Sequence, residues 1–323
     1  MLISPQAVAD MLATGATLYL AGDESVLSQL PPGNWIGGTT PYFMTSKGGV
    51  FTRDRIFVER QSALPRTLSI KRYRADQLNE MLDDAPAHGF SIVILPGLSA
   101  VHYRYASELA QNPALYTKTI VGWVSGVDLS ELGAIRPKIF DGHHRHGSAD
   151  EAVVLHAELP LGHHAQIGML NLFEPGRGDV LSFETEGFVV DDCCVNGVRR
   201  NFANYLIERN IDTLLPLVAT ERGANVNVSL QRIDQETGTV SFYAPVFRGV
   251  EYRVAHPVDH YETAFTAQLP PGGLRPEFSC NCILNYLYSG LEGKTTGMMV
   301  GPITFGEIAH RLLNQTLVYL EIS

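Results

Sequence analysis

The segment FSCNCILNYL, residues 278–287, indicates the fold class most directly. Residues 278–282 suit a buried strand, and residues 283–289 suit a short helix that Gly290 ends. Because a strand here runs directly into a helix, the segment predicts a chain in which strands and helices are mixed.

Cys280 is the most distinctive residue of this segment. If Ser279 or Asn281 caps the following helix, the Cys280 thiol lies at a helix N-terminus, where the helix dipole favours a thiolate or a bound anion. A small buried apolar side chain is the alternative interpretation. Cys280 is therefore the one candidate for a catalytic nucleophile.

Glu307 is the second candidate, in the sequence Gly301-Pro302-Ile303-Thr304-Phe305-Gly306-Glu307-Ile308. A carboxylate that follows an apolar strand and a glycine can point into a cavity and accept N–H groups of a ligand. A solvated turn residue is the competing interpretation.

Strand and helix patterns alternate on either side of these residues. In the first half, residues 90–95 and 119–124 are expected strands, and residues 101–111 an expected helix. Strands dominate the second half, and the run Pro270-Pro271-Gly272-Gly273 separates an expected helix, residues 256–268, from the closing module. The pattern predicts an α+β fold, with two subdomains whose predominantly antiparallel or mixed sheets are flanked by helices.

Two expected strands end in small residues. Residues 35–39 read WIGGT and residues 120–124 read IVGWV. Strand ends of this kind can line one crevice, which makes Gly38, Thr39 and Trp123 candidate ligand contacts, or they can be ordinary exits into turns.

The charge balance limits the choice of partners. The 323 residues include 24 Lys and Arg and 34 Asp and Glu, for a net charge of -10. Nucleic acids and anionic membrane surfaces attract basic patches, so neither is an expected partner. Residues 1–20 lack a basic segment ahead of an apolar run, so no signal peptide is expected, and no apolar stretch approaches the roughly 20 residues of a membrane span.

Four cysteines, Cys193, Cys194, Cys280 and Cys282, form two close pairs. Without a secretory signal such pairs do not predict a disulfide framework, and reduced thiols in the cytoplasm are expected.

Histidines cluster in the region His143–His164, which includes His143, His144 and His146. No HExxH or CxxC pattern accompanies them, so no metal site is predicted. A haem or metal site in this region remains an alternative, because a single axial histidine has no local signature.

Several short motifs, taken in order, resemble the FIST family of intracellular sensory domains. Residues 91–126, 138–142 and 151–155 resemble its N-terminal part. The C-terminal part is similar at residues 215–217, 230–234, 240–242, 252–255, 278–280, 305–308 and 314–317. The family motif F-S-C-x-x-R is altered, because Ile283 stands where arginine is expected.

The resemblance implies a FIST N-terminal-like domain over residues 1–200 and a FIST C-terminal-like domain over residues 201–323. It also implies a bacterial-type cytoplasmic sensor that binds a small molecule and signals through a separate protein. Some FIST proteins bind haem; no cofactor is predicted here, and haem is kept as the alternative.

The sequence thus predicts a ligand-binding sensory protein rather than an enzyme. Its expected ligand contacts are Gly38, Thr39, Trp123, Cys280, Asn281 and Glu307. A thiol-dependent enzyme that uses Cys280 is the second hypothesis, and a haem or metal protein that uses the His143–His164 region is the third.

Overall fold

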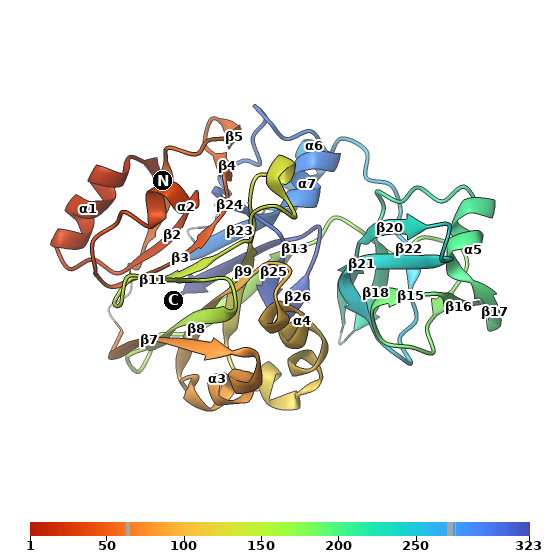
Figure 1. Cartoon of the computed structure of the whole chain (residues 1–323), viewed down its shortest axis with the longest axis horizontal. Coiled ribbons are helices and arrows are strands. Elements are labelled where there is room, and N and C mark those ends of the chain that lie inside the picture. The colour runs from red at the N-terminus through yellow and green to blue at the C-terminus, as the bar shows by residue number, and fades with distance from the viewer. Residues whose placement is uncertain (63–64, 222, 270–273, 275) are drawn as a thin grey trace. The chain divides into compact units, whose positions relative to one another are not determined.

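A computed structural model describes every residue of the chain except 63–64, 222, 270–273 and 275. The described residues form two compact units, and each is considered by itself (Figure 1). Unit 1 comprises Met1–Leu170, Phe265–Leu312 and Leu317–Ser323, and unit 2 comprises Asn171–Ala264 and Leu313–Thr316. The expected boundary at residue 200 divides the chain once, whereas the chain passes from one of these units to the other several times. The FIST assignments attached to that boundary stay predictions.

The described residues of unit 1 form three six-stranded sheets. The first has the order β1 (Leu2–Ile3), β6 (Ile56–Arg60), β2 (Leu18–Gly22), β3 (Trp35–Thr39), β10 (Ile139–Asp141), β11 (His146–Ser148). The second has the order β26 (Arg311–Leu313), β25 (Glu307–Ala309), β9 (Ile120–Ser125), β8 (Gly89–Pro96), β12 (Glu151–Glu158), β7 (Thr67–Arg74). The third has the order β13 (Ala165–Leu170), β27 (Leu317–Ile322), β23 (Phe278–Cys282), β24 (Gly301–Thr304), β4 (Tyr42–Thr45), β5 (Gly48–Phe51).

Three strand pairs in these sheets are parallel, namely β2 with β3, β8 with β9, and β23 with β24. Most of the other pairs are antiparallel. This mixture of strand directions, with helices between the strands, confirms the predicted α+β class with mixed and antiparallel sheets. Because β2 and β3 are parallel, their carboxyl ends lie at the same edge of their sheet.

The helices of unit 1 lie against these sheets. They are α1 (Pro5–Ala13), α2 (Glu24–Leu27), α3 (Leu78–Asp84), α4 (Ala100–Ser107) and α7 (Ile283–Tyr288), with short 3₁₀ turns η1 (Ala75–Gln77), η2 (Leu109–Gln111), η3 (Pro113–Thr117) and η4 (Leu129–Glu131). The core beneath α1 and α2 includes Val8, Leu27 and Trp35, which are buried with the apolar residues of β2 and β6. Helix α3 packs against β7, and α4 packs against β8 and β12 (Figure 1).

Unit 2 has its own apolar core, with Phe183, Phe202 and Phe242 in mutual ring contact. Its strands form the sheets β14 (Leu181–Ser182), β16 (Asp192–Val195), β17 (Val198–Asn201); β15 (Gly187–Val190), β21 (Thr239–Val246), β20 (Leu230–Asp234); and β19 (Ala224–Val228), β18 (Leu217–Glu221), β22 (Arg253–Val254). Helix α5 (Phe202–Glu208) belongs to this unit, and α6 (Tyr261–Gln268) spans the change from unit 2 to unit 1.

Three local predictions have different outcomes. The helix expected to begin at residue 256 begins at Tyr261, because Pro257 disfavours a helical conformation at His256 and because His260 has a φ of 53°. The punctuation at residues 270–273 lies outside the described residues. The buried strand expected at residues 90–95 is confirmed as β8, in which Phe90 to Pro96 are all buried.

Candidate functional site

Five of the six expected ligand contacts lie in the interior of unit 1. Gly38 in β3 faces Trp123 in β9, and a Cβ atom on Gly38 would lie 2.6 Å from Trp123 Cη2 and 2.7 Å from Ile94 Cγ2. The missing side chain therefore lets the two strands approach, and the indole fills the space. Trp123 is in turn the strand partner of Glu307 in β25.

Thr304 connects the remaining members of this interior group. Its hydroxyl lies 3.3 Å from both the backbone oxygen of Asn281 and Oε1 of Glu307. The Cys280 thiol lies 3.5 Å from the backbone oxygen of Gly122. The structure thus brings Gly38, Trp123, Cys280, Asn281 and Glu307 into one packed region, and their contact with a ligand stays a prediction.

The local setting of Cys280 differs from the expected one. Cys280 lies within β23, and the residue at the N-cap of α7 is Cys282, which makes no side-chain capping hydrogen bond. The prediction that Ser279 or Asn281 caps this helix is therefore wrong. The Asn281 carboxamide oxygen instead accepts hydrogen bonds from the Cys282 N–H, at 2.8 Å, and from Asn285 Nδ2, at 3.0 Å.

Burial decides the protonation state of Cys280. Desolvation, followed by the charges of Glu307 and Glu59, raises the pKa of the Cys280 thiol well above its usual value. At neutral pH the side chain is an uncharged thiol, which is a poor nucleophile. Glu307 is likewise fully buried, so the solvated-turn interpretation of that residue is wrong.

Thr39, the sixth expected contact, lines a pocket of about 250 Å³. We call this the polar pocket; it is lined by Asp23, Glu24, Ser25, Thr39, Thr40, Pro41, Arg53, Gly126, Val127, Glu131, Ile135 and Arg136. Asp23 directly follows β2, and Thr39 and Thr40 close β3 and follow it. The pocket therefore lies at the carboxyl ends of a parallel strand pair, where ligands commonly bind in α/β proteins.

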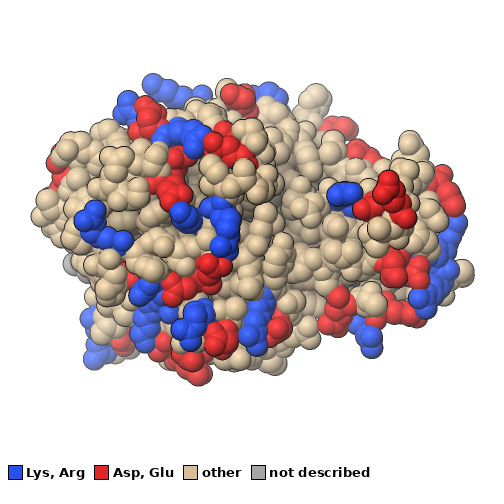
Figure 2. All heavy atoms as spheres, viewed as in Figure 1, with Lys and Arg blue, Asp and Glu red and all other residues tan. Residues whose placement is uncertain are grey.

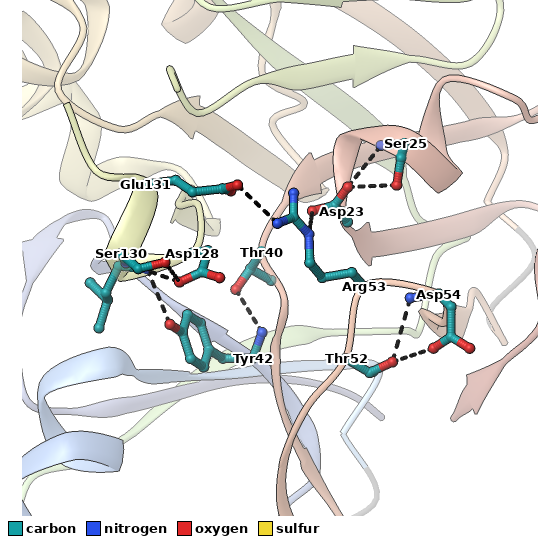
Figure 3. A network of polar contacts seen from close by, with 11 residues as sticks. Asp23, Ser25, Thr40, Tyr42, Thr52, Arg53, Asp54, Asp128, Ser130 and Glu131 are labelled. Atoms are coloured by element: carbon teal, nitrogen blue, oxygen red, sulfur yellow. Dashed lines mark hydrogen bonds and ion pairs between the residues drawn. The ribbon is translucent and has the colours of Figure 1, made fainter. Parts of the chain in front are cut away.

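Arg53 lies between two carboxylates of the polar pocket (Figure 3). Its Nε is 2.8 Å from Asp23 Oδ2, and its Nη1 is 3.0 Å from Glu131 Oε1. These contacts raise the pKa of Arg53, with the hydrogen bond to Glu131 as the largest cause. The guanidinium is thus held in place, and its Nη2 group makes no hydrogen bond to another described residue.

The acidic partners of Arg53 are themselves held in position. Asp23 caps α2, because its Oδ1 accepts hydrogen bonds from the Ser25 N–H, at 2.9 Å, and the Ser25 hydroxyl, at 2.6 Å (Figure 3). Glu131 ends η4, whose cap residue Asp128 accepts hydrogen bonds from Ser130. Those hydrogen bonds hold the pKa of Asp128 below its usual value. Two short helical turns thereby orient the charged groups before any ligand arrives.

Hydrogen bonds to backbone groups hold Thr39 and Thr40, which line the polar pocket. The Thr39 hydroxyl accepts a hydrogen bond from the Lys138 N–H at 2.9 Å, and the Thr39 carbonyl accepts one from Gly126 at 2.7 Å. The Thr40 hydroxyl donates to the Ile303 carbonyl at 2.7 Å. Thr39 therefore shapes the pocket, while the charged side chains are the groups able to bind a ligand.

Histidines of the His143–His164 region are engaged with protein groups. His143 Nε2 lies 2.7 Å from Asn34 Oδ1, His144 Nδ1 lies 2.7 Å from Asp141 Oδ2, and His146 Nε2 lies 2.9 Å from Glu151 Oε2. Within the part of the chain that the structure describes, no group of three or more His, Cys, Asp or Glu side chains is arranged to hold a metal ion.

Sequence reasoning missed Asp23, Arg53, Glu131 and Arg136. Asp23 carried a usable signal, because an Asp-x-Ser sequence directly after an apolar strand is typical of a capped helix start. The pairing of Arg53 with Glu131 spans 78 positions in the chain, and no local pattern predicts it. Figure 2 shows that basic and acidic side chains also lie close to one another elsewhere on the face of unit 1 that it draws.

The described part of the chain contains no helix long and apolar enough to cross a membrane. No curated protein and no solved structure matches the chain. One family model matches residues 3–323, and its description is a family of unknown function, DUF6976. This match does not bear on the resemblance to FIST, which stays a prediction. Because the match covers nearly the whole sequence, the chain belongs to the family of unknown function DUF6976.

Proposed function

We propose that this protein is a cytoplasmic sensory protein that binds a small polar molecule in the polar pocket and signals through a separate protein. The observation that carries the proposal is Arg53, held between Asp23 and Glu131 at the carboxyl ends of β2 and β3. The role in signalling is supported by the resemblance to FIST sensory domains.

The chemistry of the pocket favours a ligand with both anionic and cationic or hydroxyl groups. Arg53 supplies donors for a carboxylate or carbonyl oxygen, and a planar guanidinium suits such oxygens well. Glu131 and Glu24 line the same pocket and can accept hydrogen bonds from ammonium or hydroxyl groups. A volume of about 250 Å³ suits a molecule of metabolite size, such as a free amino acid, rather than a dinucleotide.

A thermal shift screen of the full chain tests the proposal, with amino acids, other small metabolites and haem as ligands. A ligand present at 100 times its Kd stabilises the native state by about 2.7 kcal/mol, which raises the Tm. We expect at least one small polar compound to do so, and we expect the Arg53→Gln variant to lose the shift.

Arg55 provides the matched control. It is two residues from Arg53, its side chain is half exposed, and its nearest carboxylate, on Asp54, is 4.0 Å away. The Arg55→Gln variant should keep the full thermal shift. A ligand that stabilises the wild type and the Arg53→Gln variant equally would place binding elsewhere and contradict the proposal.

A further inference from the structure

A surface segment, residues 128–136, forms one side of the polar pocket. It connects β9 to β10 and contains η4. Glu131, Ile135 and Arg136 of this segment line the pocket. Figure 3 shows that Glu131 extends from η4 toward Arg53, which lies in the turn between β5 and β6. The position of the segment therefore decides how open the pocket is on this side.

The segment has no apolar anchor in the core. The structure describes every residue from 128 to 136, and none of them is buried. Its larger apolar side chains include Leu132 and Ile135, which are 40% and 37% exposed. Parts of a protein with few buried apolar contacts open at a lower free energy than its core strands do. The segment is therefore held mainly by its polar contacts.

Within the described residues, these polar contacts join the segment to the rest of unit 1 at three places. The Leu129 N–H donates to Tyr42 Oη at 3.1 Å, and Glu131 Oε1 lies 3.0 Å from Arg53 Nη1. At the far end, Arg136 pairs with the turn that follows β11. Of the three, the ion pair of Glu131 is the contact that also occupies the group to which a ligand would bind.

The two carboxylates on Arg53 differ in how firmly they are held. Asp23 binds Nε and is fixed as the cap of α2, because its other oxygen accepts hydrogen bonds from Ser25. Glu131 binds Nη1 and belongs to the segment without a core anchor. A carboxylate that binds a guanidinium bidentately takes two adjacent donors. A ligand carboxylate that binds both Nη groups therefore replaces Glu131, whereas a neutral carbonyl oxygen can bind Nη2 alone and leave Glu131 in place.

This exchange costs little, because the ion pair is exposed. The side chains of Arg53 and Glu131 are 43% and 31% exposed. Exposed ion pairs contribute little net stability, since water solvates both partners when they separate. The replacement of one carboxylate by another also leaves the charge of Arg53 neutralised.

We propose that Glu131 is a built-in competitor for Arg53, and that a ligand carboxylate replaces it and releases residues 128–136 from the edge of the polar pocket. This inference rests on the proposed function, because it takes Arg53 as the ligand-binding residue. It adds the step by which binding changes the surface of unit 1, since the released segment carries Leu132 and Ile135.

Hydrogen–deuterium exchange of the full chain, measured by mass spectrometry on peptides that cover residues 128–136, tests the competitor role without any ligand. The Glu131→Ala variant should exchange about two- to fivefold faster in this segment, the size of effect expected from the loss of one exposed ion pair. Glu208→Ala, which loses an exposed ion pair with Arg200 in unit 2, is the matched control and should exchange here as the wild type does. The double variant Arg53→Gln/Glu131→Ala should exchange no faster than Glu131→Ala, because both changes remove the same pair.

Potassium acetate tests the competition itself. Acetamide has the same shape without the charge, and potassium chloride at the same ionic strength accounts for screening. Acetate should raise the exchange rate of residues 128–136 in the wild type toward that of Glu131→Ala, and both control compounds should raise it less. In Glu131→Ala, acetate should have no more effect than chloride, because the segment is already released.

An unchanged exchange rate in Glu131→Ala would overturn the competitor role, and so would additive effects in the double variant. Acetate that is no more effective than chloride in the wild type would overturn release by a carboxylate. These results are separate from the thermal shift screen. A screen without a stabilising compound would contradict the proposed function even if Glu131→Ala behaves as expected, and a shift lost in Arg53→Gln would support that function even if Glu131→Ala does not.

Discussion

The polar side chains of Tyr73, Asp84, Ser91 and His156 form a chain with only one consistent set of hydrogen-bond directions. Tyr73 lies 2.8 Å from Asp84 Oδ2 and 2.8 Å from His156 Nε2, and Ser91 lies 2.8 Å from His156 Nδ1. Burial alone would raise the pKa of Asp84, but hydrogen bonds from Lys71 and Tyr73 hold it below its usual value. An ionised Asp84 only accepts, so Tyr73 donates to it, His156 Nε2–H donates to Tyr73, and Ser91 donates to Nδ1.

This arrangement makes His156 neutral in the native state and predicts acid sensitivity. Desolvation lowers the pKa of His156 to about 4, from 6.5 when the chain is unfolded. Below pH 6.5 the unfolded state binds the proton more tightly, so stability is complete above pH 6.5 and is lost as the pH falls toward 4. Urea unfolding at several pH values measures this loss.

The His156→Gln variant should lose stability less steeply between pH 6.5 and 4, and exposed His163→Gln should follow the wild type. An unchanged pH slope in His156→Gln would show that the buried neutral histidine is not the cause.

Cys280 gives a second prediction at the scale of one residue. The thiol is buried and its pKa is raised, so alkylation by iodoacetamide at pH 7.5 should be much slower than that of free cysteine. Mass spectrometry of the peptide that contains Cys280 measures the rate. Alkylation as fast as that of free cysteine would restore the hypothesis of a thiol-dependent enzyme.

At the scale of elements, Gly38 controls how closely β3 approaches Trp123. In the Gly38→Ala variant the added methyl group would lie 2.6 Å from the indole, and overpacking of this kind costs about 1–3 kcal/mol. Urea unfolding should show this loss, while Gly178→Ala, where a Cβ atom meets nothing within 4 Å, should be near neutral. A Gly38→Ala variant as stable as the wild type would mean that this contact is easily relaxed.

The sequence predicted elements better than it predicted the site. The strands at 90–95 and 119–124 appear as β8 and β9, because long apolar runs have a clear signal. Arg53 lies in the turn between β5 and β6. A local pattern does not show such a turn, and it also does not show which distant carboxylate pairs with Arg53.

The interior group illustrates the same limit. Cys280, Asn281 and Glu307 were singled out for their chemistry, and the structure does bring them close to Gly38 and Trp123. Burial depends on the three sheets around them, which no short motif encodes. Residue type therefore predicted which side chains lie close together in the interior. The polar pocket lies instead at the ends of β2 and β3. Of the residues that line it, the sequence predicted only Thr39 as a ligand contact.

At the level of the whole molecule, the proposed ligand binding belongs to unit 1. The polar pocket lies within this unit, and the carboxylate of Glu24, one of its lining residues, is paired with Lys138. Unit 2 has a separate apolar core, and none of its described residues lines the polar pocket. Ligand binding is therefore expected to depend on the charged residues at the ends of β2 and β3.

A crystal structure of the chain with the most stabilising polar compound from the thermal shift screen would show directly whether the polar pocket binds it. We expect ligand density in the polar pocket, with an acceptor atom of the ligand within hydrogen-bonding distance of Arg53. Density elsewhere, with Arg53 still held only by Asp23 and Glu131, would contradict it.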